Sequence, residues 1–185
     1  MRWQKGNYRI PGKVEGIAEP VSCGIEVVKE FSAKVNLLSD VNWENGLTQW
    51  ELQKSGEHVV AQLHPEFEKP FPAPPVNALR VESPKNFTFS TCQQVTITKE
   101  GYYDLQVEYR GADTTNVDIR LFIQTQEETK ETMIHPTEHE WEIYEVKNVL
   151  CKPQIITVGI RISSPPVYGL MRRFSLFTSQ EAKER

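Results

Sequence analysis

The chain has 185 residues, of which 38% are hydrophobic and 25% charged, enough for a single domain with a substantial core. Its formal net charge is −4 and its sequence pI is near 5.7, so the composition offers no basic surface for nucleic acid or an anionic membrane. No apolar run approaches the ~18–20 residues that span a bilayer, and eight Phe, six Tyr, four Trp, twelve Pro and ten Gly favour an all-β chain.

The amino terminus contains no apolar stretch of the kind found in a signal peptide. Two origins are compatible with this: a cytoplasmic protein, or a piece of a larger secreted chain, which we favour. Residues 1–33 are interrupted by Gly and Pro and are interpreted as a lead-in or edge segment packed on the next domain. Residues 34–178 are expected to form that domain, and residues 179–185 a C-terminal tail.

Short strands are expected in the first half of the chain, separated by turn-forming residues. The segment 64–76 contains five prolines, which exclude a central strand, so we expect a loop that displays Phe67 and Phe71. The predicted strands span residues 22–29, 34–38, 47–53, 58–63, 78–82 and 87–97.

The second half contains the clearest alternation of apolar and polar residues. Residues 103–109 alternate strictly, and residues 117–123 and 156–162 repeat the pattern, with Phe122 interrupting the polar side. Further strands are predicted over 141–149 and 170–177, and no helical period extends over ten residues. About ten short strands indicate an all-β sandwich or jelly roll, with one face of each sheet in the core.

Three stretches resemble carbohydrate-binding modules with the galactose-binding-like jelly roll. They are NLLSDVNWENGLTQW at 36–50, VTI followed by GYYDL at 95–105, and EWEIY followed by RFSL at 140–176. The resemblance extends over residues 34–178 in the expected order. It implies a non-catalytic, monomeric module that binds a polysaccharide or oligosaccharide and targets a tethered glycoside hydrolase to its substrate, outside the cell.

The chain departs from the family pattern near its end. Arg172 and Arg173 stand where an acidic pair is common, and this puts in doubt the structural calcium that such modules often carry. The remaining candidate oxygen ligands are Glu26, Asp40 and Glu44, whereas a calcium site needs about 6–8 oxygens. No other cofactor is expected.

Two surfaces are candidates for sugar binding, which needs flat aromatics and planar polar side chains. One candidate is a sheet face, which forms only if the strands that carry these residues are neighbours. The alternative interpretation of the same residues is a solvated sheet face with ordinary ion pairs and no sugar site. The sheet-face candidates are Gln106, Glu108, Asp118, Arg120, Phe122 and Arg161.

The other candidate surface is a loop rim, where Phe67, Phe71 and Tyr168 lie near prolines that stiffen the chain. The alternative for each Phe is that it covers the core. Trp43, Trp50 and Trp141 match framework positions and are expected in the core.

Two other classes of function remain open. A jelly-roll glycoside hydrolase or polysaccharide lyase would need paired carboxylates such as Glu108, Glu142 or Glu145, and a structural or protein-interaction sandwich would need no sugar site. Cys92 and Cys151 could form a disulfide, although buried free thiols are favoured.

Overall fold

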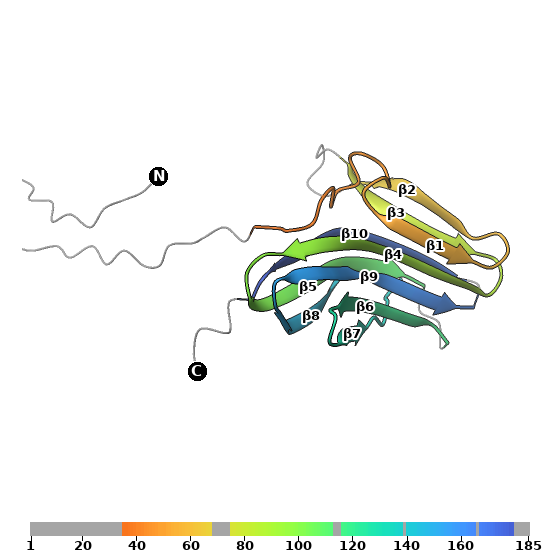
Figure 1. Cartoon of the computed structure of the whole chain (residues 1–185). Coiled ribbons are helices and arrows are strands. Elements are labelled where there is room, and N and C mark those ends of the chain that lie inside the picture. The colour runs from red at the N-terminus through yellow and green to blue at the C-terminus, as the bar shows by residue number, and fades with distance from the viewer. Residues whose placement is uncertain (1–34, 68–74, 113–115, 139, 166, 180–185) are drawn as a thin grey trace, which may run out of the picture. The chain divides into compact units, whose positions relative to one another are not determined.

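The computed structural model describes residues 35–67, 75–112, 116–138, 140–165 and 167–179. Within these ranges it contains ten strands and no helix, hence none long and apolar enough to cross a membrane. The all-β prediction is confirmed (Figure 1). The predicted lead-in, residues 1–33, lies outside the described residues. The strands are β1 Glu51–Ser55, β2 Val60–Glu66, β3 Val76–Ser83, β4 Phe87–Ile97, β5 Gly101–Gly111, β6 Asp118–Gln124, β7 Thr129–Met133, β8 Glu142–Cys151, β9 Gln154–Ser164 and β10 Val167–Thr178.

These strands form two antiparallel five-stranded sheets. The first sheet has the order β1-β4-β9-β6-β7, and the second sheet has the order β2-β3-β10-β5-β8. One hydrophobic cluster contains the inward side chains of both sheets, so the two sheets form a sandwich. The predicted β-sandwich is therefore confirmed.

The alternation seen in the sequence places the core side chains. Ile119, Leu121 and Ile123 of β6 are at most 1% exposed, and the apolar positions of β5 and β9 are buried in the same way. Each buried Leu or Ile side chain contributes about 1.5–3 kcal/mol relative to an exposed one. The intervening residues of these strands face outward, which decides where the polar side chains lie.

Three expected elements differ from the structure. Residues 35–38 are irregular, although the Leu37 amide donates a 2.8 Å hydrogen bond to the Leu176 carbonyl. Strand β1 begins at Glu51 rather than at residue 47, and β2 continues through Pro65 to Glu66, which an edge strand tolerates. Strand β7 was not predicted, because its mostly polar, partly exposed sequence has no apolar face.

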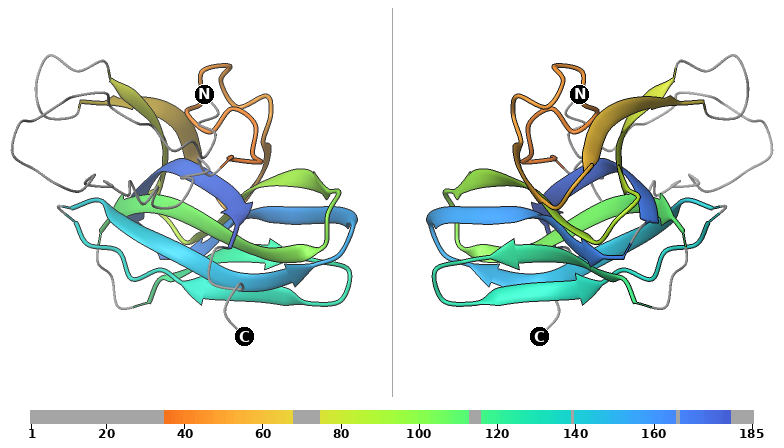
Figure 2. Two further views of the ribbon diagram at one scale, coloured as in Figure 1. Left: turned by 90° about the vertical axis from the view of Figure 1, so that its left-hand side faces the viewer. Right: turned by 90° about the vertical axis from the view of Figure 1, so that its right-hand side faces the viewer.

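Residues 36–50 form a series of turns, here called the entry segment. It lies near β1 and β2 and away from β6 and β7 in the views of Figure 2. Trp43 and Trp50 anchor it in the core, where they are 1% and 4% exposed and lie with ring centroids 6.1 and 4.8 Å from that of Phe174. The core placement of both tryptophans is confirmed.

Candidate functional site

The predicted sheet-face residues lie on two different surfaces. Strand β5, which carries Gln106 and Glu108, belongs to the second sheet, whereas β6 and β9 belong to the first. The expectation of one shared surface is therefore wrong. Alternation tells which side of a strand a residue occupies, but it does not tell which sheet the strand joins. The residues assigned to the first sheet are Asp118, Arg120, Phe122 and Arg161.

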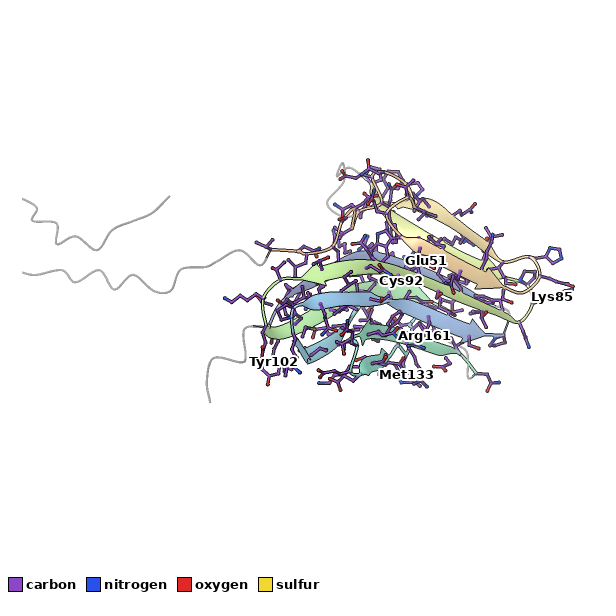
Figure 3. The ribbon with its side chains drawn as sticks, viewed as in Figure 1. Glu51, Lys85, Cys92, Tyr102, Met133 and Arg161 are labelled. Carbon is purple, nitrogen blue, oxygen red and sulfur yellow. The ribbon has the colours of Figure 1, made fainter. Side chains whose placement is uncertain are left out.

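Figure 3 labels Glu51, Cys92, Arg161 and Met133 along the outer face of the first sheet. An ion-pair network lies on the β9, β6 and β7 part of this face. Arg161 lies 2.5 Å from a Glu131 carboxylate oxygen, and Arg120 donates hydrogen bonds to Asp118 at 2.7 Å and Glu131 at 3.0 Å. These two hydrogen bonds raise the pKa of Arg120. The charged side chains of this part of the face therefore pair with one another.

Phe122 does not present a flat ring to solvent on that face. Its side chain is only 6% exposed, and the Arg161 guanidinium lies 4.7 Å from the ring centroid. With so little of the ring exposed, no flat face remains on which a sugar could stack. The prediction of Phe122 as an exposed platform is wrong.

The outer face of the second sheet brings together a tryptophan and several arginines. Trp141 precedes β8 and is partly exposed, with the guanidinium carbons of Arg172 and Arg110 at 4.1 and 5.0 Å from its ring centroid. The expectation that Trp141 lies in the core is wrong. Together with Glu108 and Arg173, these residues are here called the Trp141 site.

A break in strand pairing aims two consecutive arginines at one carboxylate. The β10–β5 register shifts between Arg172 and Ser175, and Arg173 has a φ of 52°. Such a bulge re-aims side chains that would otherwise point to opposite faces. Arg172 Nε donates to one Glu108 oxygen at 2.7 Å, and Arg173 Nη1 donates to the other at 2.9 Å. A left-handed non-glycine residue costs energy, and such strain is common at binding sites.

A depression of about 360 Å³ adjoins the Trp141 site. Glu108 and Arg173 line it, together with Gln106 of β5 and with Asn42 of the entry segment. Ile143, 64% exposed, supplies an apolar wall. Two of the predicted binding residues, Gln106 and Glu108, therefore line one depression, although Gln106 also donates a hydrogen bond to Glu145.

Further pairs extend the same face toward β2 and β3. Arg110 donates to Glu66 at 3.0 Å, and a His64 ring nitrogen lies 3.1 Å from the other Glu66 oxygen. Arg80 lies 2.6 Å from Glu82 and 5.7 Å from the centroid of the Tyr168 ring. Tyr168 is partly buried in β10 and is not on a loop, so its predicted position is wrong.

The predicted loop rim is only partly described. Phe67 is 68% exposed, and Phe71 lies outside the described residues. A second depression, of about 550 Å³, lies where strands of the two sheets turn into one another. Its polar lining is uncharged and consists of Ser55, Asn86, Thr88, Asn116, Ser163 and Ser164.

Of the candidate calcium ligands, Asp40 accepts backbone hydrogen bonds within a turn, and Glu26 lies outside the described residues. The Asp40 carboxylate accepts the Glu44 amide at 2.7 Å and the Asn45 amide at 3.1 Å, closing a turn of the entry segment. Across the described ranges, His, Cys, Asp and Glu form no group of three that could hold a metal ion. Glu26 is not described, and calcium stays a prediction.

Cys92 and Cys151 are free thiols, as favoured from the sequence. Cys151 is fully buried in the core, and burial raises its pKa to about 11. Cys92 lies on the outer face of β4, where burial and then the nearby Glu51 charge raise its pKa. The alternative of a disulfide between them is wrong.

Each carboxylate considered for an enzymatic role has a partner. Glu108 holds two arginines, Glu142 accepts a hydrogen bond from the Tyr144 hydroxyl at 2.5 Å, and Glu145 lies 2.7 Å from Lys147. Burial and the bond to Glu142 raise the pKa of Tyr144.

Sequence reasoning missed Asn42, Arg110, Trp141, Arg172 and Arg173 as residues of this surface. Arg110 could have been found, because it continues the outward-facing positions of the alternating strand 103–109. The position of Arg173 depends on a bulge and that of Asn42 on turns, neither of which leaves a periodic signal.

No protein-family model matches the chain, and no curated protein matches its sequence. Solved structures do match. The module TmCBM61, in complex with β-1,4-galactotriose, is 18% identical with a TM-score of 0.65, covering 78% of this chain and 99% of that one. The CBM22-1 xylan-binding domain of Paenibacillus barcinonensis Xyn10C is 13% identical with a TM-score of 0.53, covering 81% and 98%.

A third similar structure is the enzymatically active domain of bacteriophage CBA120 tailspike protein 4. It is 12% identical with a TM-score of 0.61, covering 78% of this chain and 21% of that chain. At these identities the similarity is one of fold. The chain has the β-sandwich fold of carbohydrate-binding modules.

Proposed function

We propose that this protein is a non-catalytic module that binds a neutral oligosaccharide or polysaccharide at the Trp141 site. The observation that carries the proposal is the partly exposed indole of Trp141 beside Arg110 and Arg172 on an open sheet face. Sugars stack their C–H faces on flat aromatic rings, and planar guanidinium and carboxylate groups bind adjacent hydroxyls. The carbohydrate-binding modules of the same fold support this assignment.

A neutral ligand suits the charges of this face. Arg80 pairs with Glu82, Arg110 with Glu66, and the exposed Arg173 with Glu108. Each pair offers donors and acceptors side by side, which matches a hydroxyl group that both donates and accepts. A charged ligand would have to displace one partner of a pair and leave the other uncompensated.

The same proposal includes the wider role expected from the sequence. The module is a monomeric part of a larger extracellular protein and keeps an attached glycoside hydrolase close to its substrate. Tethering raises local concentration, so a site with micromolar to millimolar affinity, roughly −4 to −8 kcal/mol, is sufficient. The tailspike protein, in which a similar fold covers 21% of the chain, supports a modular arrangement.

The test is electrophoresis through native gels containing β-galactan, xylan, mannan or β-glucan, with polygalacturonate as the acidic comparison. We expect retardation in at least one neutral gel, and we expect Trp141→Ala to abolish it. Ile155→Ala is the matched control, since Ile155 is a 58% exposed apolar residue of the first sheet. Reducing-sugar release by the wild type would favour the enzymatic alternative.

Three outcomes would contradict the proposal. Wild-type protein that migrates freely in every gel would favour a structural or protein-interaction sandwich. Retardation that survives Trp141→Ala but is lost in Asn116→Ala would move the site to the second depression. Retardation in the polygalacturonate gel alone would show that the ligand is an acidic polysaccharide and not a neutral one.

A further inference from the structure

Gln93 holds both ends of the loop that forms one wall of the depression. Gln93 is a residue of β4 in the first sheet, its side chain is directed into the core, and it is 8% exposed. Its side-chain oxygen accepts the Ser39 amide at 2.8 Å, and its side-chain nitrogen donates to the Ser39 carbonyl at 3.1 Å and the Gln49 carbonyl at 3.0 Å. One buried amide therefore closes the loop between Ser39 and Gln49.

This loop belongs to no strand and is shaped by turns. Asp40 and Trp43 have φ values of 48° and 56°, and hydrogen bonds link Trp43 to Asp40 and Gly46 to Trp43 within the loop. Two non-glycine residues in the left-handed region are unfavourable by themselves. The conformation therefore needs anchors outside the loop, and Gln93 provides three hydrogen bonds at its two ends.

The closed loop reaches the bulge that carries Arg173. Asn42 and Val41 line the same depression as Arg173 and Glu108. Asn36 reinforces the same junction, because its side chain donates to the Phe174 carbonyl at 3.0 Å and accepts the Leu176 amide at 2.9 Å. Asn36, three residues before the loop begins, is thus bonded to β10 directly after Arg173, and the loop and the arginine bulge line the same depression.

We propose that Gln93 is a positioning residue for ligand binding on the opposite sheet, and that it acts by holding Asn42 at the depression, where the Asn42 amide binds ligand hydroxyls. This inference rests on the proposed function of the Trp141 site. Asn42 is exposed and both donates and accepts hydrogen bonds. Asn42 is therefore a specificity-determining residue, and Gln93 acts only through it.

A double-mutant cycle separates positioning from a structural role. Calorimetric titration with the glycan that binds the wild type is run on Asn42→Ala, Gln93→Met and the double variant. We expect each single variant to bind about 5–10-fold more weakly, as the loss of one or two ligand hydrogen bonds predicts. The double variant should bind no more weakly than Gln93→Met alone, because a displaced Asn42 has no contact left to lose.

Thr91→Val is the matched control. Thr91 lies two residues from Gln93 on the same inward side of β4, is 0% exposed, and its hydroxyl has no hydrogen-bond partner in the described part of the chain. Its replacement should leave the affinity unchanged. If Gln93→Met does not fold, Gln93→Glu keeps the acceptor for the Ser39 amide, loses both donors, and should weaken binding in the same direction.

The outcomes are distinguishable. Multiplicative losses in the double variant, or unchanged affinity in folded Gln93→Met, would overturn the positioning role and leave the proposed function intact. Unchanged affinity in Asn42→Ala would overturn the contact between Asn42 and the ligand and leave the proposed function intact. Wild-type protein that binds no glycan would overturn both proposals.

Discussion

The guanidinium of Arg172 lies 4.1 Å from the centre of the Trp141 ring, on the outer face of the second sheet. Arg172 is nevertheless buried, at 6% exposure, because the ring and the neighbouring strands cover it. A buried guanidinium needs a buried partner, and Glu108 supplies it at 2.7 Å. Trp141 therefore packs against the Arg172 guanidinium, and the ion pair with Glu108 of β5 fixes the position of that guanidinium.

Arg172→Met should lower the free energy of unfolding by about 2–4 kcal/mol, because it leaves Glu108 with one arginine fewer in a partly buried position. Adding Glu108→Gln should recover about 1 kcal/mol or more, since it removes a partly buried carboxylate charge that has lost one of its two arginine partners. Urea denaturation of the two variants and the wild type measures both values. Equal stability of the single and double variants would contradict an energetic coupling between Arg172 and Glu108.

Arg173→Gly and Arg173→Ala should differ by about 1 kcal/mol in favour of glycine. Both variants lose the pair with Glu108, but only alanine keeps a side chain at a φ of 52°, which glycine adopts without cost. Both should bind glycan more weakly than the wild type. Thermal unfolding checks the first statement and affinity gels the second, and an alanine variant at least as stable as glycine would exclude strain at the bulge.

Phe122→Ala should reduce stability without affecting glycan binding. The ring is 6% exposed beneath Arg161, so its removal leaves a cavity that costs about 2–4 kcal/mol. The Trp141 site lies on the other sheet and keeps its contacts. Chemical denaturation and affinity gels on the same sample measure the two effects. Lost retardation in the folded variant would return the site to the first sheet.

Stability should depend on the Cys151 thiol at alkaline pH. Burial raises the pKa of Cys151 to about 11, whereas an unfolded thiol titrates near 8.5. The folded state therefore resists deprotonation, and this contribution is complete below about pH 8.5 and is lost as the pH rises to about 11. The stability difference between wild type and Cys151→Ala should shrink across that interval in urea titrations at successive pH values. A constant difference would show that the thiol does not titrate differently on folding.

The strand content could be predicted because alternation is local. A run such as Tyr103–Tyr109 can bury its apolar side in only one way, and the structure buries those positions. Strand β7 escaped prediction because an edge strand with partly exposed side chains has no such signal. Motif similarity alone places Trp141 in the core, but its ring lies against Arg110 and Arg172 instead.

The sequence by itself determined the all-β fold and the buried side of each central strand, since these depend on local periodicity. The match to family framework positions placed Trp43 and Trp50 correctly in the core, whereas the same match misplaced Trp141. Only the tertiary structure decided which strands became neighbours. It assigned Glu108 and Arg120 to opposite sheets, turned Arg173 outward through a bulge, and brought Asn42 to the same depression. Pairing between distant strands is set by the packing of the whole core, and no local pattern encodes it.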